Sequence, residues 1–552
     1  MTVLPETGSD GLARAAALQR LQLASVAPAT IVEFESRGRC LVIGDEADAL
    51  AFVRTLTGPL ECFVLVPGDT APDVDRIEGT FVVRGGRPLV RGALGDFEVA
   101  LVVAGATQKL GGLLMPAVNR FDLVVDLQAM PLLRQAMLPL GYYAPGTDAT
   151  ARAALREILP QMRGQFEKPK YINYNPEICA HGRSGKRGCT RCIDVCPAEA
   201  IVSIGEAVVV NPYLCQGGGG CATVCPSGAM TYAYPRPGDL LGGLRQLLRD
   251  YREAGGATPS LLFHDEASAV ALEQGLAESM PPHVLPVALE EIGSAGMDVW
   301  LGCLAYGAEA VVLLTCDRTP AQIIDALQEQ VATARAILGG MGYREDRLRV
   351  VNGDQPVAAL QGLSTLPTGE ARQPATFAAL GGDKRGSLRL ALVHLQDHAP
   401  ASKRITPLDR GAPFGDVRVD AAACTLCMSC VSSCPTHALQ DGRGLPQLNF
   451  REWNCVQCGL CERTCPEDAI TLQARFLHDA EARERPRTLH EEQPVCCVAC
   501  GKPFATRKML DKLARKLEGH WMFQAPEARR RLEMCEDCRV RDLFTAEARR
   551  TR

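Results

Sequence analysis

Two short stretches, CTLCMSCVSSCP at 424–435 and CVQCGLCERTCP at 455–466, decide the central part of the fold. Each follows the spacing C-x2-C-x2-C-x3-C-P, in which thiolates hold iron–sulfur cubanes and the fourth cysteine of one run serves the cluster of the other. Zinc or disulfides would not require eight cysteines and two prolines in this register. We therefore assign two [4Fe–4S] clusters to crossed ligand sets: Cys424, Cys427, Cys430 and Cys465, and Cys455, Cys458, Cys461 and Cys434.

An altered copy of this pattern lies in residues 166–235. Its first half has Lys186 where the first ligand belongs, and Cys179 lies before the insertion AHGRSGKRG. Glycines make this insertion flexible enough to bring Cys179 back to the cluster. The insertion's charged residues suit either docking of an acidic redox partner or a plain solvated loop. Crossed ligation predicts a third [4Fe–4S] cluster held by Cys179, Cys189, Cys192 and Cys225.

The second half of this copy, LCQGGGGCATVCP at 214–226, has Gly218 at the second cysteine position. Glycine has no side chain that binds iron, so a fourth site is left with three cysteines: Cys196, Cys215 and Cys221. Three thiolates suit a [3Fe–4S] cluster, or a [4Fe–4S] cluster whose fourth iron takes water or a nearby side chain. The alternative is a site that has lost its cluster, and the retention of the other ligands and the proline argues against that loss.

A third group of cysteines lies in residues 485–552, in CCVACGKPF at 496–504 and MCEDCR at 534–539. Two C-x2-C knuckles suit a tetrahedral zinc site. They predict a zinc-knuckle domain held by Cys497, Cys500, Cys535 and Cys538. Cys496 could replace Cys497, and His520 is a weaker candidate. Residues 501–552 hold 14 Lys/Arg against 8 Asp/Glu, but no base-reading module accompanies this charge, so a nucleic-acid partner is not expected.

The composition of the whole chain points to buried domains and metal ligation. The chain has 552 residues, 24 cysteines, 47% apolar residues and a net charge of −5, which does not suit a general nucleic-acid binder. The first residues mix acids and bases, unlike a signal peptide, and no apolar run approaches the roughly 20 residues that span a bilayer. Clustered cysteines without an export signal indicate metal ligands rather than disulfides. We therefore expect a cytoplasmic protein without a membrane span.

Between the cysteine groups the chain alternates strand-like and helix-like segments, which indicates two α/β domains. RCLVIGD, ECFVLVP, EVALVVAG and FDLVVDL are expected strands of the first domain, and SLLFH and EAVVLLT of the second. Gly44 to Ala47 lacks a glycine-rich phosphate turn, so we expect a scaffold, with a nucleotide or flavin site as the alternative. Cys40 and Cys62 are expected to be buried thiols. The predicted fold is multidomain α/β plus α+β, divided at 1–165, 166–235, 236–400, 408–480 and 485–552.

These motifs carry several family resemblances. Residues 408–480 resemble a bacterial two-[4Fe–4S] ferredoxin domain, and residues 175–235 resemble a modified copy. Residues 258–365, with LAYGAEAVVLLTCDRTPAQIIDALQEQ, resemble the delta subunit of methyl-viologen-reducing hydrogenase, which implies electron transfer towards heterodisulfide reductase through a [2Fe–2S] cluster. Only Cys303 and Cys316 remain in this region, so we expect its fold without its centre. The whole arrangement, including GYYAPG at 141–146, is similar to polyferredoxins found with bacterial formate dehydrogenases.

We therefore predict an iron–sulfur electron-transfer protein with up to four clusters, acting as a subunit or partner of a dehydrogenase such as formate dehydrogenase or of a hydrogenase-like complex. No catalytic base, nucleophile or substrate pocket can be named from the sequence. Two alternatives remain: an assembly factor for a metalloenzyme, and an iron–sulfur redox sensor that binds nucleic acid.

Overall fold

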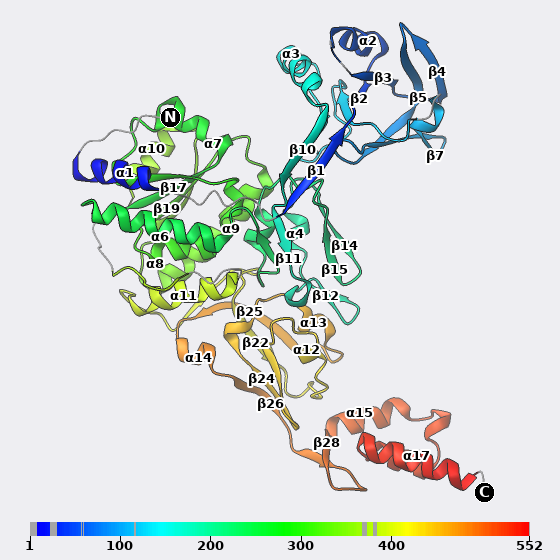
Figure 1. Ribbon diagram of the computed structural model, residues 1–552. Helices are drawn as coiled ribbons and strands as arrows, with labels where there is room; N and C mark the ends of the chain where they lie inside the picture. Colours follow the sequence, from blue (N-terminus) through cyan, green and yellow to red (C-terminus); the bar gives the residue numbers. More distant parts are fainter. Residues whose placement is uncertain are drawn as a thin grey trace.

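The computed structural model describes residues 8–21, 30–56, 58, 60–114, 118–366, 373–378 and 383–550, apart from the side chains of 275 and 546–550. Figure 1 shows that the N-terminal sheet, in blue, stands away from the rest of the molecule on a two-stranded ribbon. This ribbon consists of β1 (Ile31–Ser36) and β10 (Gly164–Pro169), which run antiparallel. It leads to a central α/β unit and two cysteine-rich modules, and the C-terminal helices lie beyond the second module.

The N-terminal unit is a mixed eight-stranded sheet. Its elements are β2 (Arg39–Ile43), α2 (Glu46–Thr55), β3 (Glu61–Val66), β4 (Gly68–Ile77), β5 (Thr80–Arg91), β6 (Glu98–Val103), β7 (Ala106–Lys109), β8 (Leu123–Asp126), β9 (Tyr142–Tyr143) and α3 (Ala149–Ile158). Strands β5, β3, β2, β8 and β9 run parallel in this order, while β4, β6 and β7 add antiparallel pairs. The apolar runs that the sequence predicts as strands form β2, β3, β6 and β8.

The central unit has a parallel four-stranded sheet in the order β18–β17–β19–β20. Its elements are α6 (Pro237–Glu253), β17 (Ser260–His264), α7 (Glu266–Ala271), β18 (Val284–Ala288), the 3-10 turn η5 (Ile292–Ser294), α8 (Met297–Ala305), β19 (Ala310–Thr315), α9 (Ala321–Gly340), β20 (Leu348–Asn352), α10 (Pro356–Ser364) and α11 (Lys384–Asp397). Helix α1 (Gly8–Arg20), which the sequence groups with the N-terminal domain, packs on α6, where Tyr251 Oη donates to Asp10 at 2.7 Å.

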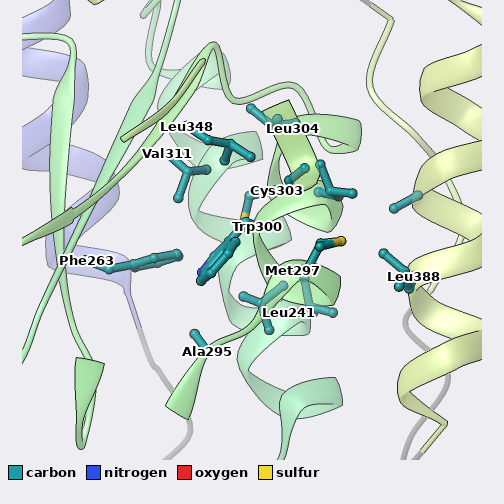
Figure 2. Close-up of a cluster of buried hydrophobic side chains, with 14 of the residues drawn as sticks. Leu241, Phe263, Ala295, Met297, Trp300, Cys303, Leu304, Val311, Leu348 and Leu388 are labelled. Atoms are coloured by element: carbon teal, nitrogen blue, oxygen red, sulfur yellow. The ribbon is translucent and has the colours of Figure 1, made fainter. Parts of the chain in front are cut away.

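The core of the central unit lies on both sides of α8. Figure 2 shows Trp300 of this helix on the side of Phe263 and Val311 from the sheet, while Leu388 of α11 faces it from the other side. Trp300 is fully buried, as is Cys303 one turn further along the helix. An apolar helix such as α8 is stable here because it is covered on both sides.

The first cysteine module consists of short hairpins and helices. Its elements are β11 (Ile172–Tyr174), β12 (Gly182–Arg183), β13 (Lys186–Arg187), α4 (Arg191–Asp194), β14 (Ile201–Ile204), β15 (Ala207–Val210), α5 (Gly220–Val224) and β16 (Met230–Tyr232). Strand β11 pairs with β16, and β14 pairs with β15, all antiparallel. The additional hairpin β12–β13 lies in the insertion that follows Cys179.

The second module repeats this plan. Its elements are β22 (Gly415–Val419), α12 (Ser429–Ser432), β23 (Leu439–Gly442), β24 (Leu445–Phe450), α13 (Leu460–Thr464) and β25 (Ile470–Leu477). Strand β22 pairs with β25 as β11 pairs with β16, and β23 pairs with β24 as β14 pairs with β15. Further elements border it: β21 (Ile405–Pro407), α14 (Ala480–Glu484) and β26 (Arg487–Glu491).

The C-terminal unit has a very small core. Its elements are β27 (Pro494–Cys496), β28 (Pro503–Thr506), α15 (Arg507–Leu517), α16 (Pro526–Leu532) and α17 (Glu536–Arg550). Its buried cluster consists of Cys497, Met534 and Cys535. Within the described ranges, no helix combines the length and the hydropathy needed to cross a membrane. The five domain boundaries given above remain predictions.

Candidate functional site

The second module groups its eight cysteines in two sets. Site C consists of Cys434, Cys455, Cys458 and Cys461, and site D consists of Cys424, Cys427, Cys430 and Cys465. Burial, followed by the charges of Cys424, Cys427 and Cys465, raises the pKa of Cys430 to about 12. In site C, burial raises the pKa of Cys461, and the charges of Cys455, Cys458 and Cys434 add to the rise. Such mutual effects require the thiols of each set to lie close together.

The backbone of the second module is curled around these thiols. Leu426, Met428 and Gln457 have positive φ angles of 54°, 60° and 53°, although they are not glycines. A residue with a side chain costs roughly 1–2 kcal/mol in this conformation, so the surrounding fold must hold it there. The curl directs backbone N–H groups at sulfur, as Ala438 N does at Cys434 Sγ (3.3 Å) and Ala469 N does at Cys465 Sγ (3.4 Å).

Site B, in the first module, consists of Cys179, Cys189, Cys192 and Cys225. Burial, followed by the charges of Cys225, Cys189 and Cys179, raises the pKa of Cys192 to about 12. Cys179 therefore lies beside cysteines that follow it across the insertion. Met230 N donates to Cys225 Sγ at 3.4 Å, as Ala438 N and Ala469 N donate to cysteine sulfur atoms in the second module.

The insertion is a hairpin with a buried base and an exposed tip. His181 is 1% exposed, with Nδ1 at 2.9 Å from Cys189 O and Nε2 at 2.8 Å from Ser203 Oγ. The neighbouring Lys186 and Arg187 of β13 are exposed. The sequence left open whether this segment docks a partner or is solvated, and both alternatives remain predictions for its exposed tip. The burial of His181 removes only that side chain from the surface.

Site A, also in the first module, consists of Cys196, Cys215 and Cys221. Burial raises the pKa of Cys221 well above its ordinary value, and the charges of Cys215 and Cys196 add to this rise. By cysteine spacing, Gly218 takes the place that Cys458 has in site C. The backbone agrees with this register, because Gly219 (φ 74°) precedes α5 as Gly459 (φ 80°) precedes α13.

The glycine run 217–220 packs directly on the central α/β unit. A Cβ atom on Gly219 would lie 2.5 Å from Ser294 Cα, and one on Gly220 would lie 2.5 Å from Ile323 Cδ1. Contacts under 3.0 Å are not tolerated without movement. The run therefore allows close approach of backbone to η5 and α9, a packing role that is separate from iron binding.

The four sites form a row in the order A–B–C–D. Cys192 of site B contributes to the raised pKa of Cys221 in site A, and Cys430 of site D contributes to that of Cys461 in site C. Between the modules, Cys189 of site B contributes to the raised pKa of Cys458, which burial chiefly raises to about 11.

The contact between sites B and C is made by β13 and α13. A Cβ on Gly188 would lie 2.7 Å from Leu460 Cγ, so the two modules touch at this glycine. Arg463 Nη1 also donates to the carbonyl oxygens of Arg187 and Gly188. This interface depends on surfaces that are distant in the sequence, and cysteine spacing alone gave no signal for it.

Three cations lie beside the sites. Lys384, at the start of α11, donates from Nζ to Ala222 O (2.6 Å), Thr223 O (2.7 Å) and Cys225 O (3.2 Å).

The next residue, Arg385, turns to the second module and donates to Pro413 O and Trp453 O, both at 3.2 Å. Lys168 Nζ donates to Cys215 O at 2.7 Å. Sequence reasoning missed all three, since Lys384 and Arg385 lie far from the cysteine motifs in the chain and Lys168 stands outside the cysteine spacing itself.

The C-terminal unit brings the sulfur atoms of Cys497, Cys500, Cys535 and Cys538 within 4.8 Å of one another. Burial would raise the pKa of Cys497, but backbone N–H groups of Cys535, Ala499 and Cys500 lower it to about 6. Four thiols at this spacing can hold a tetrahedral metal ion. Cys496 is exposed on β27 and stands outside this group, as does His520.

The remaining cysteines lie within the α/β cores. Cys40 and Cys62 face each other on β2 and β3, and the hydrogen bond with Cys62 raises the pKa of Cys40. Cys303 is buried in the core shown in Figure 2, and Cys316 Sγ lies 3.7 Å from Thr319 Oγ1.

The donor sets of the two modules fit iron–sulfur clusters. Sites B, C and D each offer four thiols, and site A offers three. The cysteines of sites A and C line two small cavities, whose other walls are mainly apolar side chains. The N–H groups directed at sulfur in both modules suit a negatively charged cluster. When bound, each such cluster takes up and releases one electron.

Comparison with known proteins also shows similarity to proteins that hold iron–sulfur clusters. Residues 423–470 match the family of the 4Fe-4S dicluster domain. The chain is 42% identical over 101 residues to "Ferredoxin-1" of Caulobacter vibrioides, a stretch that is 18% of this chain and 87% of that protein. It is 40% identical over 49 residues to "Ferredoxin-type protein NapF" of Escherichia coli K12, a stretch that is 9% of this chain and 30% of that protein.

Proposed function

This chain belongs to the ferredoxin family, and from that premise we propose that it relays single electrons along four iron–sulfur sites between two redox partners. Iron–sulfur electron transfer is the chemistry that the dicluster domain and its relatives support. The finer proposal concerns sites A to D as one continuous path. Residues of the chain supply ligands, spacing and local charge, while the redox chemistry belongs to the cofactors.

The contact between the two modules carries this proposal. Gly188 permits Leu460 to approach the ligand loop of site B, which brings Cys189 within electrostatic reach of Cys458. Without this contact the molecule would hold two separate pairs of sites. With it, sites B and C are also neighbours, and the row runs through both modules.

We propose that electrons enter at site D and leave at site A. Cations stabilise the more negative, reduced form of a cluster and so raise its reduction potential. Lys168 lies at site A and Lys384 beside sites A and B, whereas Glu492 contributes a negative charge near Cys424 of site D. The potential is therefore expected to rise from site D to site A.

The two ends of the row differ in their surroundings, which suits two different partners. Cys427 of site D is exposed, and the C-terminal unit adjoins this end, where Thr506 Oγ1 donates to Thr425 O at 3.2 Å. Site A adjoins the N-terminal unit and the central unit. The family resemblance favours a dehydrogenase, with formate dehydrogenase the leading candidate, as one partner. The cytoplasmic location remains a prediction from the sequence.

The α/β units are proposed to act as scaffolds, and the four-cysteine group as a zinc site. Zinc suits four thiolates in tetrahedral geometry. The small apolar cluster around Cys535 suits a structural role, because a unit with so little core depends on its metal to fold. Removing the ion with a chelator should unfold residues 494–550 while leaving the iron content unchanged.

Anaerobic counting of iron, sulfide and zinc, combined with EPR of oxidised and reduced protein, tests the proposed function. Four filled sites give about 15 or 16 irons per chain, with one zinc. About eight irons would show that only the second module binds clusters and would overturn the four-site path. Stable copurification with a dehydrogenase that reduces the chain would identify the donor, whereas no reduction by any copurifying enzyme would contradict a role in its electron transfer.

A further inference from the structure

The corner of site A that lacks a cysteine is faced by a methionine from a distant part of the chain. A Cβ atom on Gly218, the position equivalent to Cys458, would lie 3.1 Å from Met137 Sδ and 3.4 Å from Pro197 Cγ. The thioether sulfur thus lies in contact with the point from which the missing cysteine side chain would begin. The same methionine lines the site A cavity together with Cys196, Cys215 and Cys221.

Met137 is held in this position by its own backbone. Its N–H donates to Pro197 O at 3.0 Å, and Pro197 directly follows the site A ligand Cys196. Met137 belongs to the segment between β8 and β9 of the N-terminal sheet, so this contact fastens that unit to the first module. The side chain is half-buried, in contrast to Met130 of the same segment, which is 68% exposed.

Site C, which has all four cysteines, shows which ligand is missing from site A. Its cavity is lined by Cys434, Cys455, Cys458 and Cys461 without a methionine, whereas the site A cavity combines three cysteines with Met137. Each cavity is therefore lined by four sulfur-containing residues. Thioethers and thiolates are both soft ligands, the class that suits iron–sulfur clusters.

We propose that Met137 is the fourth ligand of site A, so that this site binds a [4Fe–4S] cluster through three thiolates and one thioether. This inference rests on the proposed function only in requiring a cluster at site A. A thioether is neutral, so the site carries one negative charge fewer than site C, and its reduction potential is higher for that reason. Lys168 beside Cys215 acts in the same direction.

Iron counting and EPR of the full chain with Met137→Leu test the proposal, because leucine keeps an apolar side chain and removes the sulfur. The wild type is expected to hold about 16 irons and to show no three-iron signal when oxidised. Met137→Leu should hold about 15 irons and show that signal. Met130→Leu, the matched control in the same segment, should behave like the wild type.

Several results would overturn the proposal, and they differ from failure of the proposed function. A wild type with about 15 irons and a three-iron signal would exclude a fourth ligand while leaving four filled sites. Unchanged iron and EPR in Met137→Leu would show that the thioether binds no iron. About 12 irons in the wild type would mean that site A is empty, which would overturn both this inference and the four-site path.

A double variant tests the charge argument even if Met137→Leu disturbs folding. In Met137→Ala with Gly218→Cys, the shortened side chain makes room for the restored cysteine, and four thiolates are again present. This variant should return to about 16 irons without the three-iron signal. An EPR-monitored titration should place its site A at a lower reduction potential than the wild type, and an equal or higher potential would contradict a neutral fourth ligand.

Discussion

Site A and site C occupy equivalent places in the two modules, yet site C has four cysteines and site A has three. The backbone is the same at both, with Gly219 and Gly459 in the left-handed conformation before the following helix. The two sites differ in which other parts of the chain pack against them. At site A, the N-terminal unit brings Met137 and the central unit presses on Gly219 and Gly220. A glycine at a ligand position therefore marks close packing between units, and it does not by itself mark a degenerate site.

The position that follows the left-handed glycine, Gly220 in the first module and Leu460 in the second, packs against a different neighbour in each module. Gly220 packs against Ile323 of the central unit, while its equivalent, Leu460, packs against Gly188 of the first module. In each case a glycine on one partner admits a larger apolar side chain of the other. The first module thus packs against the central unit and the second module, and the second module keeps an exposed cysteine, Cys427, at site D.

The largest expected effect comes from converting site C into a copy of site A. Cys458→Gly removes one thiolate where no methionine lines the cavity. We expect a loss of about one to four irons per chain and a lower temperature of unfolding, measured by anaerobic iron analysis and calorimetry. Cys496→Gly is the control, because that exposed cysteine lies outside the four-sulfur group. Full iron content in Cys458→Gly would remove the distinction between the two sites.

The contact between the modules can be opened by adding one methyl group. In Gly188→Ala the new Cβ meets Ala180 O at 2.5 Å and Leu460 Cγ at 2.7 Å, which should lower the free energy of unfolding by about 1–3 kcal/mol. Rapid-mixing kinetics should also show slower electron equilibration between the modules.

Gly242→Ala in α6 is the matched control for this change. No atom lies within 4 Å of its new Cβ, and alanine is favoured over glycine in a helix by about 1 kcal/mol. If both variants gain stability and keep wild-type kinetics, the contact at Gly188 does not join the modules.

Adjacent cations at the start of α11 allow each module to be altered separately. Lys384→Met removes a charge beside Cys225 and should lower the reduction potentials of the first module. Arg385→Met should lower that of site C, since Arg385 lies near Cys455. Each change leaves buried carbonyl groups without a donor, at a cost of about 1–3 kcal/mol in unfolding free energy. Equal shifts in both modules from either variant, seen by EPR-monitored titration, would contradict this division.

The smallest expected effect concerns the exposed end of the row. Glu492 adds to the rise in the pKa of Cys424, which burial chiefly causes, and the carboxylate also pairs with Lys508 at 2.7 Å. Glu492→Gln should therefore raise the reduction potential of site D slightly and leave sites A and B unchanged. Glu491→Gln on the neighbouring exposed position is the control. A downward shift in Glu492→Gln would contradict the charge argument on which the proposed direction of electron flow rests.

Parts of the fold were accessible from the sequence because they depend on local patterns. Apolar runs of four to seven residues, such as EAVVLLT, form buried parallel strands, and β19 follows this rule. The grouping of Cys179 with Cys189 and Cys192 followed from comparison with the intact cysteine spacing at residues 424–466. The C-x2-C spacing favoured Cys497 and left Cys496 as an alternative, and the approach of the second knuckle in the structure groups Cys497 with the other three cysteines.

The sequence by itself determined the candidate ligand sets, since cysteines with only two or three residues between them are held near one another by the covalent chain. It also determined that Gly218 interrupts one set. Only the tertiary structure decided that the sites form a single row, that Met137 faces the interrupted corner, and that Lys384 and Arg385 serve different modules. These contacts join residues far apart in the chain through packing of whole surfaces, for which no local spacing or periodicity exists.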